Sequence, residues 1–405
     1  MCPKYLYLRE GLLPLEETVI TCFSVGMKIV ADIHIPFLRG LLEPFADVVY
    51  LSGQAIRKED IKDADALLVR TRTQCDRNLL EGTKVRFIGT TAIGFDHIDQ
   101  DYCEAKHITW VNAPGCNAKA VAQYVTSSLL TLAKQYGFNL SKKTLGIIGV
   151  GQCGQKVERN ARLLEMNILL NDPLRARNEG EKNFDSLDRI LEESDIITLH
   201  PTLEKEGPDK TYHLLDAAFF ARLKRPIFLI NTARGAIIDT NALKQAMDEG
   251  KVIDCALDCW ENEPDIDKDL LQRCLVTTPH IAGYSSDGKA NATRIVLEQL
   301  NTFFQLNLPR IVPDLPVPEC PVFTVPKNSK DKIASALLHA YDPLLDSKAL
   351  KESPEQFESM RSNYELRREY KAYRLLNLPD KEGDLLRAFG FQLPPHPADK
   401  QLKEL

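Results

Sequence analysis

The fold of this chain is decided by one stretch of its sequence, Thr144-Leu145-Gly146-Ile147-Ile148-Gly149-Val150-Gly151-Gln152-Cys153-Gly154. The apolar residues 144–148 read as a buried strand, and a G-x-G-x-x-G pattern and helix-like sequence follow directly. Glycines at this spacing let the backbone turn tightly and approach a pyrophosphate, which the N-terminus of the next helix stabilises. A bare G-x-G-x-x-G is often only a turn, but this context predicts a dinucleotide-binding domain.

An acidic residue at the end of the next expected strand indicates which dinucleotide binds. Asp172 follows the apolar run 168–171 and lies 18 residues after Gly154. In dinucleotide-binding domains an acid about 20 residues past the last glycine holds the ribose hydroxyls. A carboxylate there repels a 2′-phosphate, so we expect NAD, although Arg175 and Arg177 leave NADP open.

Apolar strand-like runs alternate with helical sequence on both sides of the glycine motif. They occupy residues 27–32, 66–70, 85–89, 168–171, 196–200, 227–231, 255–258 and 276–278. A long helix is expected over residues 118–135, which contain no Gly or Pro. This alternation is typical of parallel sheets. The expected fold class is α/β: a Rossmann-type doubly wound NAD domain inserted in a flavodoxin-like α/β substrate domain, followed by a small C-terminal α+β domain.

The domain limits follow from these runs and from a Pro-rich linker. We expect an N-terminal extension at 1–26, a discontinuous substrate-binding domain at 27–119 and 285–308, the NAD domain at 120–284, and a C-terminal dimerisation domain at 327–393. The extension carries no motif, and we expect it to be dispensable.

The C-terminal segment is short and rich in charge, yet it carries much apolar surface that something must cover. The side chains concerned are Leu337, Leu338, Tyr341, Leu344, Leu345, Phe357, Met360, Tyr364, Tyr370 and Tyr373. We expect a second copy of the chain to cover them, making a homodimer. The alternative is that the segment packs against its own NAD domain.

Composition excludes several classes of protein. The 405 residues include 51 Lys and Arg against 57 Asp and Glu, a net charge of −6, which argues against a nucleic-acid partner. Charges interrupt every apolar stretch, so we expect no membrane span and no secretory signal. The ten cysteines are scattered without metal-ligand spacing, so we expect no metal, and reduced thiols in a cytoplasmic protein.

Polar segments follow three successive strands, and the carboxyl ends of parallel strands meet at one crevice. The segments read NTARG at 231–235, DCWENEP at 258–264 and TPHIAGY at 278–284. Oxidising a 2-hydroxy acid needs a cation for the carboxylate and a base for the hydroxyl proton. Arg234 and His280 offer these groups, and Glu263 beside the imidazole would orient it and raise its pKa. Taken singly, each also has a purely structural interpretation.

With its G-x-G-x-x-G, Arg-Gly, D-x-W-x-x-E-P and P-H-x-A-G in this order, the sequence resembles the D-2-hydroxyacid dehydrogenase family. The resemblance runs from Met27 to about Tyr373. More specific stretches are VRTRT at 69–73, IGFDHID at 93–99, NAPGCN at 112–117 and NYELRRE at 363–369. The resemblance implies an NAD-dependent enzyme, and a set of donors near Arg70 and Arg72 suits a phosphorylated 2-hydroxy acid.

The resemblance also implies a role for individual residues. Arg234 and Glu263 are implied as active-site residues and His280 as the proton donor or acceptor. The implied NAD contacts are Gly149, Gly151, Gln152, Cys153, Gly154, Asp172, Thr232, Asp258 and Gly283, and the implied substrate contacts are Thr71 and Tyr284.

Two positions depart from the family pattern. Ala92, preceded by Thr90 and Thr91, stands where the family usually has a substrate-contacting Thr, and His200-Pro201 replaces the usual Thr-Pro. Two other functions stay open: a related dehydrogenase of the phosphoglycerate or hydroxypyruvate type, and an NAD-sensing corepressor on the same fold.

Overall fold

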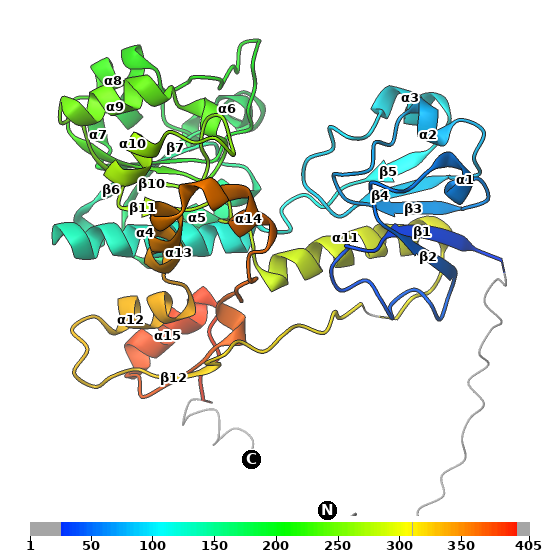
Figure 1. Ribbon diagram of the computed structural model, residues 1–405. Helices are drawn as coiled ribbons and strands as arrows, with labels where there is room; N and C mark the ends of the chain where they lie inside the picture. The colour runs from blue at the N-terminus through cyan, green and yellow to red at the C-terminus, as the bar shows by residue number, and fades with distance from the viewer. Residues whose placement is uncertain (1–25, 310, 395–405) are drawn as a thin grey trace, which may run out of the picture.

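The computed structural model describes residues 26–309 and 311–394, so the expected N-terminal extension, apart from Gly26, lies outside the described residues. Two parallel sheets lie side by side, and a smaller C-terminal unit packs below the second one (Figure 1). No helix in the described part of the chain is both long and apolar enough to cross a membrane.

The first sheet has the strand order β2-β1-β3-β4-β5, which is the flavodoxin-like order. Its strands are β1 Lys28–Asp32, β2 Asp47–Leu51, β3 Ala66–Val69, β4 Phe87–Thr90 and β5 Thr109–Val111, and its short helices are α1 Lys58–Ile61, α2 Arg77–Leu80 and α3 Gln100–Ala105. The central strands β3 and β4 are buried throughout, as parallel strands usually are. The sequence analysis missed β2 and β5, the partly buried edge strands.

Helix α11, Ser286–Phe304, returns from the second sheet and packs against the first (Figure 1). Its Val296 shares a core with Leu68 of β3, and a Cβ on Gly89 would lie 2.4 Å from Cγ1 of Val296. Only a glycine at position 89 therefore allows α11 to pack so closely against β4. This packing supports a substrate-binding domain made from 27–119 and 285–308, whose limits stay a prediction.

The second sheet contains six parallel strands in the order β11-β10-β9-β8-β6-β7. They are β6 Thr144–Ile148, β7 Asn167–Asn171, β8 Ile196–Leu199, β9 Ile227–Asn231, β10 Val252–Leu257 and β11 Val276–Thr277. The helices are α4 Ala118–Tyr136, α5 Gln152–Leu163, α6 Pro173–Glu179, α7 Leu187–Glu193, α8 Ala217–Arg222, α9 Thr240–Asp248 and α10 Lys268–Arg273. The strand order reverses between β6 and β8, the place where doubly wound sheets bind ligands.

The C-terminal unit combines helices with a two-stranded parallel sheet, which completes the predicted fold class. Its strands are β12 Val322–Thr324 and β13 Arg374–Leu376, and its helices are α12 Lys332–Ala340, α13 Pro343–Glu352, α14 Phe357–Ser362 and α15 Asp380–Phe389.

This unit covers much of its apolar surface with its own chain. Leu337, Tyr341, Phe357, Tyr370 and Tyr373 are all buried. Tyr341, for example, packs on a tyrosine of α4 with ring centroids 5.9 Å apart. The expectation that a second copy must cover these five side chains is wrong, because the NAD domain offers them an apolar face. Two leucines of α13, at 344 and 345, stay 39% and 73% exposed.

Candidate active site

The glycine motif forms a turn between β6 and α5, and a side chain would be unfavourable at each of its three glycines for a different reason. Gly149 has φ +85°, and a Cβ there would lie 2.4 Å from the backbone nitrogen of Pro201. A Cβ on Gly154 would lie 2.2 Å from the carbonyl oxygen of Gly149. Around Gly151, in contrast, no protein atom lies within 4 Å of a Cβ. The outer glycines thus serve packing, and the middle one leaves the open approach that a pyrophosphate needs.

The start of α5 suits the same ligand. Gln152 and Cys153 form its first turn, and no side chain caps the N-terminus at Gly151. The first backbone N–H groups of a helix lack internal partners and attract anions.

Asp172 stands beside this turn at the end of β7. Its carboxylate accepts hydrogen bonds from the backbone N–H groups of Val150 (2.9 Å) and Arg175 (3.0 Å). The Arg175 guanidinium donates to the Val150 carbonyl, and both Arg175 and Arg177 pair with carboxylates of this chain. Neither arginine is therefore free for a 2′-phosphate, which favours NAD over NADP.

Thr232 follows β9 and meets the unusual His200 that follows β8. Its hydroxyl lies 3.2 Å from Nδ1 of His200, and Nε2 of that ring lies 2.9 Å from the Thr198 hydroxyl. Burial lowers the pKa of His200 to about 3, so the imidazole is neutral. The contact of Thr232 with NAD stays a prediction.

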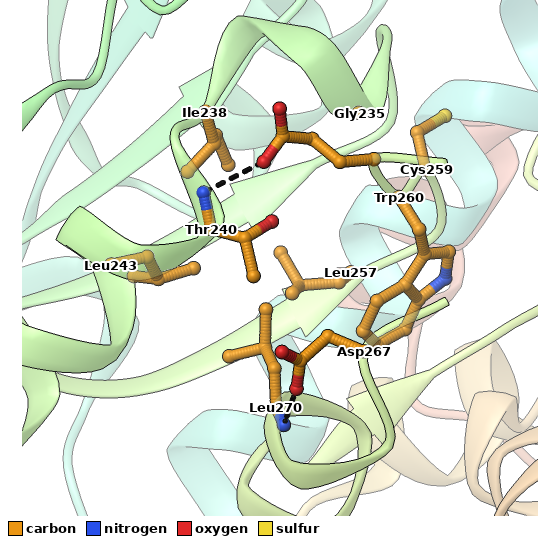
Figure 2. A pocket seen from close by; sticks show the side chains of 10 residues that line it. Gly235, Ile238, Thr240, Leu243, Leu257, Cys259, Trp260, Asp267 and Leu270 are labelled. Carbon is orange, nitrogen blue, oxygen red and sulfur yellow. Dashed lines mark hydrogen bonds between the residues drawn. The ribbon is translucent and has the colours of Figure 1, made fainter. Parts of the chain in front are cut away.

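Gly235 brings the segment of Arg234 against the segment of Glu263. A Cβ on Gly235 would lie 1.9 Å from the carbonyl carbon and oxygen of Trp260, so only glycine fits. Gly235 and Trp260 line the same pocket (Figure 2). The volume of this pocket is about 10 Å³, which is too small for a substrate. Glu261 accepts a hydrogen bond from the backbone of Thr240 across this cavity. The predicted Arg-Gly and D-x-W-x-x-E-P motifs are therefore in direct contact.

His280 and Glu263 form the pair that the sequence predicts. Nδ1 of His280 lies 2.8 Å from Oε2 of Glu263, whose other oxygen accepts the backbone N–H of Trp260 at 2.8 Å. Burial alone would lower the pKa of His280, but the neighbouring Cys259 and Glu263 raise it. Burial also raises the pKa of the Cys259 thiol, so near neutral pH the charged neighbour is Glu263. The carboxylate orients the imidazole and favours its protonated form.

Asp258 shapes the loop that carries His280, whose φ is +57°. The carboxylate is almost fully buried and accepts hydrogen bonds from the backbone N–H groups of Ile281 (2.7 Å) and Ala282 (2.9 Å). The structure therefore gives Asp258 a positioning role, and its contact with NAD stays a prediction.

Arg234 follows the end of β9, and Nη1 of its guanidinium donates a hydrogen bond to the Ala233 carbonyl at 2.8 Å. Its side chain is exposed, and among the described residues no carboxylate lies within ion-pair distance of it. It also lies near the glycine turn: burial raises the pKa of the Cys153 thiol to about 11, and the Arg234 charge works against that rise. Arg234 is available to hold a substrate carboxylate.

Cys259, Glu263 and His280 also place one possible metal-ligand atom each within 4.8 Å of one another. A metal there would compete for the imidazole nitrogen that Glu263 already holds at 2.8 Å. We therefore interpret the group as a proton-transfer site.

Gly283 and Tyr284 end the catalytic loop. A Cβ on Gly283 would lie 2.2 Å from Nδ2 of Asn117, so this glycine lets the loop pack on the start of α4. The Tyr284 ring is half-buried, with its centroid 6.3 Å from that of Tyr364 in the C-terminal unit. The contacts of Gly283 with NAD and of Tyr284 with substrate stay predictions.

Thr71 lies on the other sheet, exposed at the end of β3. Near Ala92, Thr90 is buried with its hydroxyl 3.0 Å from Nε2 of His97, and the Thr91 hydroxyl faces the Val69 carbonyl. Whether Thr91 replaces the contact expected at Ala92 and whether Thr71 contacts the substrate both stay predictions.

The sequence analysis missed Arg367, which holds the catalytic loop from the C-terminal unit. Its guanidinium donates to the carbonyl oxygens of Ile281 (3.0 Å), Ala282 (2.5 Å) and Tyr284 (2.9 Å), and to that of Ala120 in α4 (3.2 Å). The signal available in the sequence was the Arg-Arg pair inside the NYELRRE stretch at 363–369.

Two family models match the chain. The model of the D-isomer specific 2-hydroxyacid dehydrogenase NAD-binding domain matches residues 117–282, and a model of a domain of unknown function matches residues 315–390. The first match confirms NAD as the cofactor.

Curated relatives cover almost the whole described chain. A protein named erythronate-4-phosphate dehydrogenase from Bacteroides thetaiotaomicron is 49% identical over 87% of this chain and 100% of that protein. One of the same name from Cronobacter sakazakii is 39% identical over 92% of this chain and 100% of its own length. The NAPGCN and NYELRRE stretches favour the same group within the larger family.

Solved structures confirm the predicted fold class. A 3-phosphoglycerate dehydrogenase from Entamoeba histolytica with bound NAD+ has a TM-score of 0.56, with 26% identity over 72% of this chain and 100% of that chain. A D-lactate dehydrogenase from Aquifex aeolicus with NAD and lactic acid has a TM-score of 0.54, with 26% identity over 70% of this chain and 97% of that chain. The chain belongs to the erythronate-4-phosphate dehydrogenases, NAD-dependent enzymes of the D-2-hydroxyacid dehydrogenase family.

Proposed function

We propose that this enzyme oxidises 4-phospho-D-erythronate with NAD to (R)-3-hydroxy-2-oxo-4-phosphooxybutanoate, a step in pyridoxal 5′-phosphate biosynthesis. The name of the relatives supports the substrate. The observation that carries the chemistry is the 2.8 Å contact between His280 and Glu263, next to the segment of Arg234.

In the proposed reaction Arg234 binds the substrate carboxylate through its planar fork. His280 takes the proton of the C2 hydroxyl as the hydrogen on C2 leaves with its electron pair. Because Nδ1 faces Glu263, Nε2 is the nitrogen left for this proton. NAD, when bound, supplies the acceptor for the hydride. Glu263 stabilises the imidazolium that forms, since its charge favours the protonated ring.

A substrate comparison tests the proposal. The purified enzyme is given NAD with 4-phospho-D-erythronate, 3-phosphoglycerate or glycerate, and NADH formation and product mass are measured. We expect the highest kcat/KM with 4-phospho-D-erythronate. A higher kcat/KM with 3-phosphoglycerate would assign the chain to a different reaction, and stoichiometric NAD binding without turnover would favour the corepressor.

We also propose that the enzyme is a cytoplasmic homodimer. The eight cysteines in the described part of the chain are all free, which suits a reducing compartment. For the dimer, the support is the exposed pair Leu344 and Leu345 together with exposed valines at 312, 317 and 322. Light scattering at micromolar concentration checks the dimer, and a monomer there would contradict it.

A further inference from the structure

We propose that Arg70, Lys289 and Arg361 together bind the phosphate group of the substrate. These residues come from the end of β3, the first turn of α11 and helix α14, so the site joins the first sheet and the α11 helix that packs on it to the C-terminal unit. The inference rests on the proposed function, because it names the part of the same site that takes the phosphorylated end.

Tyr284 of the catalytic loop brings two of the cations together. The Lys289 ammonium lies 4.3 Å from the centroid of the Tyr284 ring, and the Tyr284 side chain also interacts electrostatically with the Arg361 guanidinium. The backbone holds α11 beside the segment that follows α14, because Ser286 donates its N–H to the Arg367 carbonyl at 2.9 Å (Figure 1). Both charges therefore lie next to the loop that carries the catalytic histidine.

Arg361 also lies close to the reaction centre. Its Nη1 is 3.9 Å from Oε2 of Glu263, the same oxygen that contacts His280. Its other carboxylate neighbour, Glu358, is equally 3.9 Å away. Both distances are too long for hydrogen bonds, so the guanidinium keeps donors for a ligand.

Arg70 brings the third charge from the end of β3. Within the described residues, its guanidinium makes one long hydrogen bond, from Nη1 to the carbonyl oxygen of His34 at 3.4 Å. Burial and the charges of Arg70 and Arg361 together lower the pKa of Lys289 to about 8. Arg70 is also linked to α11 by contacts, because the 34–36 segment that it touches accepts a hydrogen bond at the Pro36 carbonyl from Thr293, one turn after Lys289. The charges of both arginines therefore act on Lys289.

Such a cluster is unfavourable unless an anion joins it. In the described part of the chain, no carboxylate lies within ion-pair distance of Lys289 or Arg70. Lys289 is half-buried, so water compensates its charge only in part. A phosphate monoester carries close to two negative charges and accepts several charge-assisted hydrogen bonds, which matches two guanidinium groups and an ammonium.

The test combines two measurements on the full chain. Calorimetry measures the binding of inorganic phosphate without NAD, and kinetics compare 4-phospho-D-erythronate with unphosphorylated D-erythronate. The variants are Lys289→Met, Arg361→Gln and Arg361→Lys. The matched control is Arg294→Gln, on the same helix α11, where the arginine pairs with Glu298 on an exposed face.

We expect Lys289→Met and Arg361→Gln to lower the kcat/KM preference for the phosphorylated substrate by roughly 30- to 1000-fold, the usual effect of removing one partner from a desolvated charge pair. Phosphate affinity should fall in parallel, Arg361→Lys should recover part of both losses, and the control should match the wild type. If Lys289→Met does not fold, the result for Arg361→Gln alone decides whether the phosphate site is correct.

The outcomes separate this site from the proposed function. Equal losses on both substrates with unchanged phosphate affinity would overturn the site and leave the function standing. A second outcome is that the wild type fails to oxidise 4-phospho-D-erythronate but binds inorganic phosphate, and that the variants bind phosphate more weakly. In that case the proposed function is wrong and the phosphate site stands.

Discussion

Replacing Arg367 with lysine should weaken the loop that carries the catalytic histidine. Arg367 donates to four backbone carbonyls, three of them between residues 281 and 284. An ammonium has three donors and lacks the planar fork, so one or two buried carbonyls lose their partner. Each such loss costs about 1–3 kcal/mol, so we expect a decrease of about 2–4 kcal/mol in the free energy of unfolding. Most domains have only about 5–15 kcal/mol in total.

The same substitution should affect catalysis, because the loop sets the position of His280. A misplacement of about 1 Å can cost roughly 100-fold in rate, so kcat should fall about 10- to 100-fold, with little change in NAD affinity. Chemical denaturation and steady-state kinetics measure the two effects. The matched control is Arg387→Lys, whose arginine pairs with Asp384 on the exposed part of α15. An Arg367→Lys enzyme with the stability and kcat of the control would refute the role of Arg367 in holding the catalytic loop.

Four further substitutions test the remaining parts of the site. His280→Ala should lower kcat roughly 10²- to 10⁴-fold with little loss of NAD affinity, and near-native turnover would remove its role in proton transfer. Glu263→Gln removes the charge that raises the pKa of His280, so the imidazole becomes a free base at lower pH. The acidic limb of the kcat/KM profile for oxidation should then move to lower pH, and an unmoved limb would contradict the pairing. Arg234→Lys should raise KM and lower kcat/KM, because an ammonium cannot reproduce the fork on a carboxylate, and unchanged kinetics would count against that contact. Gly151→Ala should fold as stably as the wild type but bind NAD more weakly in a titration, since the added methyl group occupies open space at the turn; unchanged NAD affinity would argue against a pyrophosphate there.

The parts of the fold that could be predicted are those whose burial shows in the sequence. Strands β6, β8 and β9 lie inside the second sheet and agree with the predicted runs to within a residue, because a parallel strand covered on both faces needs an unbroken apolar run. Strands β2 and β5 lie at the edges of the first sheet and are only partly buried. β5 has only three residues, and β2 was missed although residues 48–51 form an apolar run.

The candidate site divides in the same way. Arg234, Glu263 and His280 follow neighbouring strands of one sheet, so parallel topology alone brings their segments together. Arg367 lies more than 80 residues from the carbonyls it binds, and Arg361 is similarly far from Glu263. Contacts of this kind depend on how one domain docks on another, which neither periodicity nor strand order determines.

Because the C-terminal unit docks on its own NAD domain, a second copy of the chain is not needed to cover its buried aromatic side chains or to hold the catalytic loop. Its buried aromatic side chains share a core with α4, and Arg367 links that unit to the catalytic loop within one chain. Removing the unit would therefore expose apolar surface on α4 and free the loop, whatever the oligomeric state. A truncated protein that becomes inactive would not by itself prove a dimer. A sharper test of the dimer is the oligomeric state of Leu345→Glu. This substitution changes a side chain that is 73% exposed and leaves the buried core and the hydrogen bonds of Arg367 in place. A monomeric variant of normal stability would support a dimer interface on α13, whereas an unchanged dimer would place that interface elsewhere.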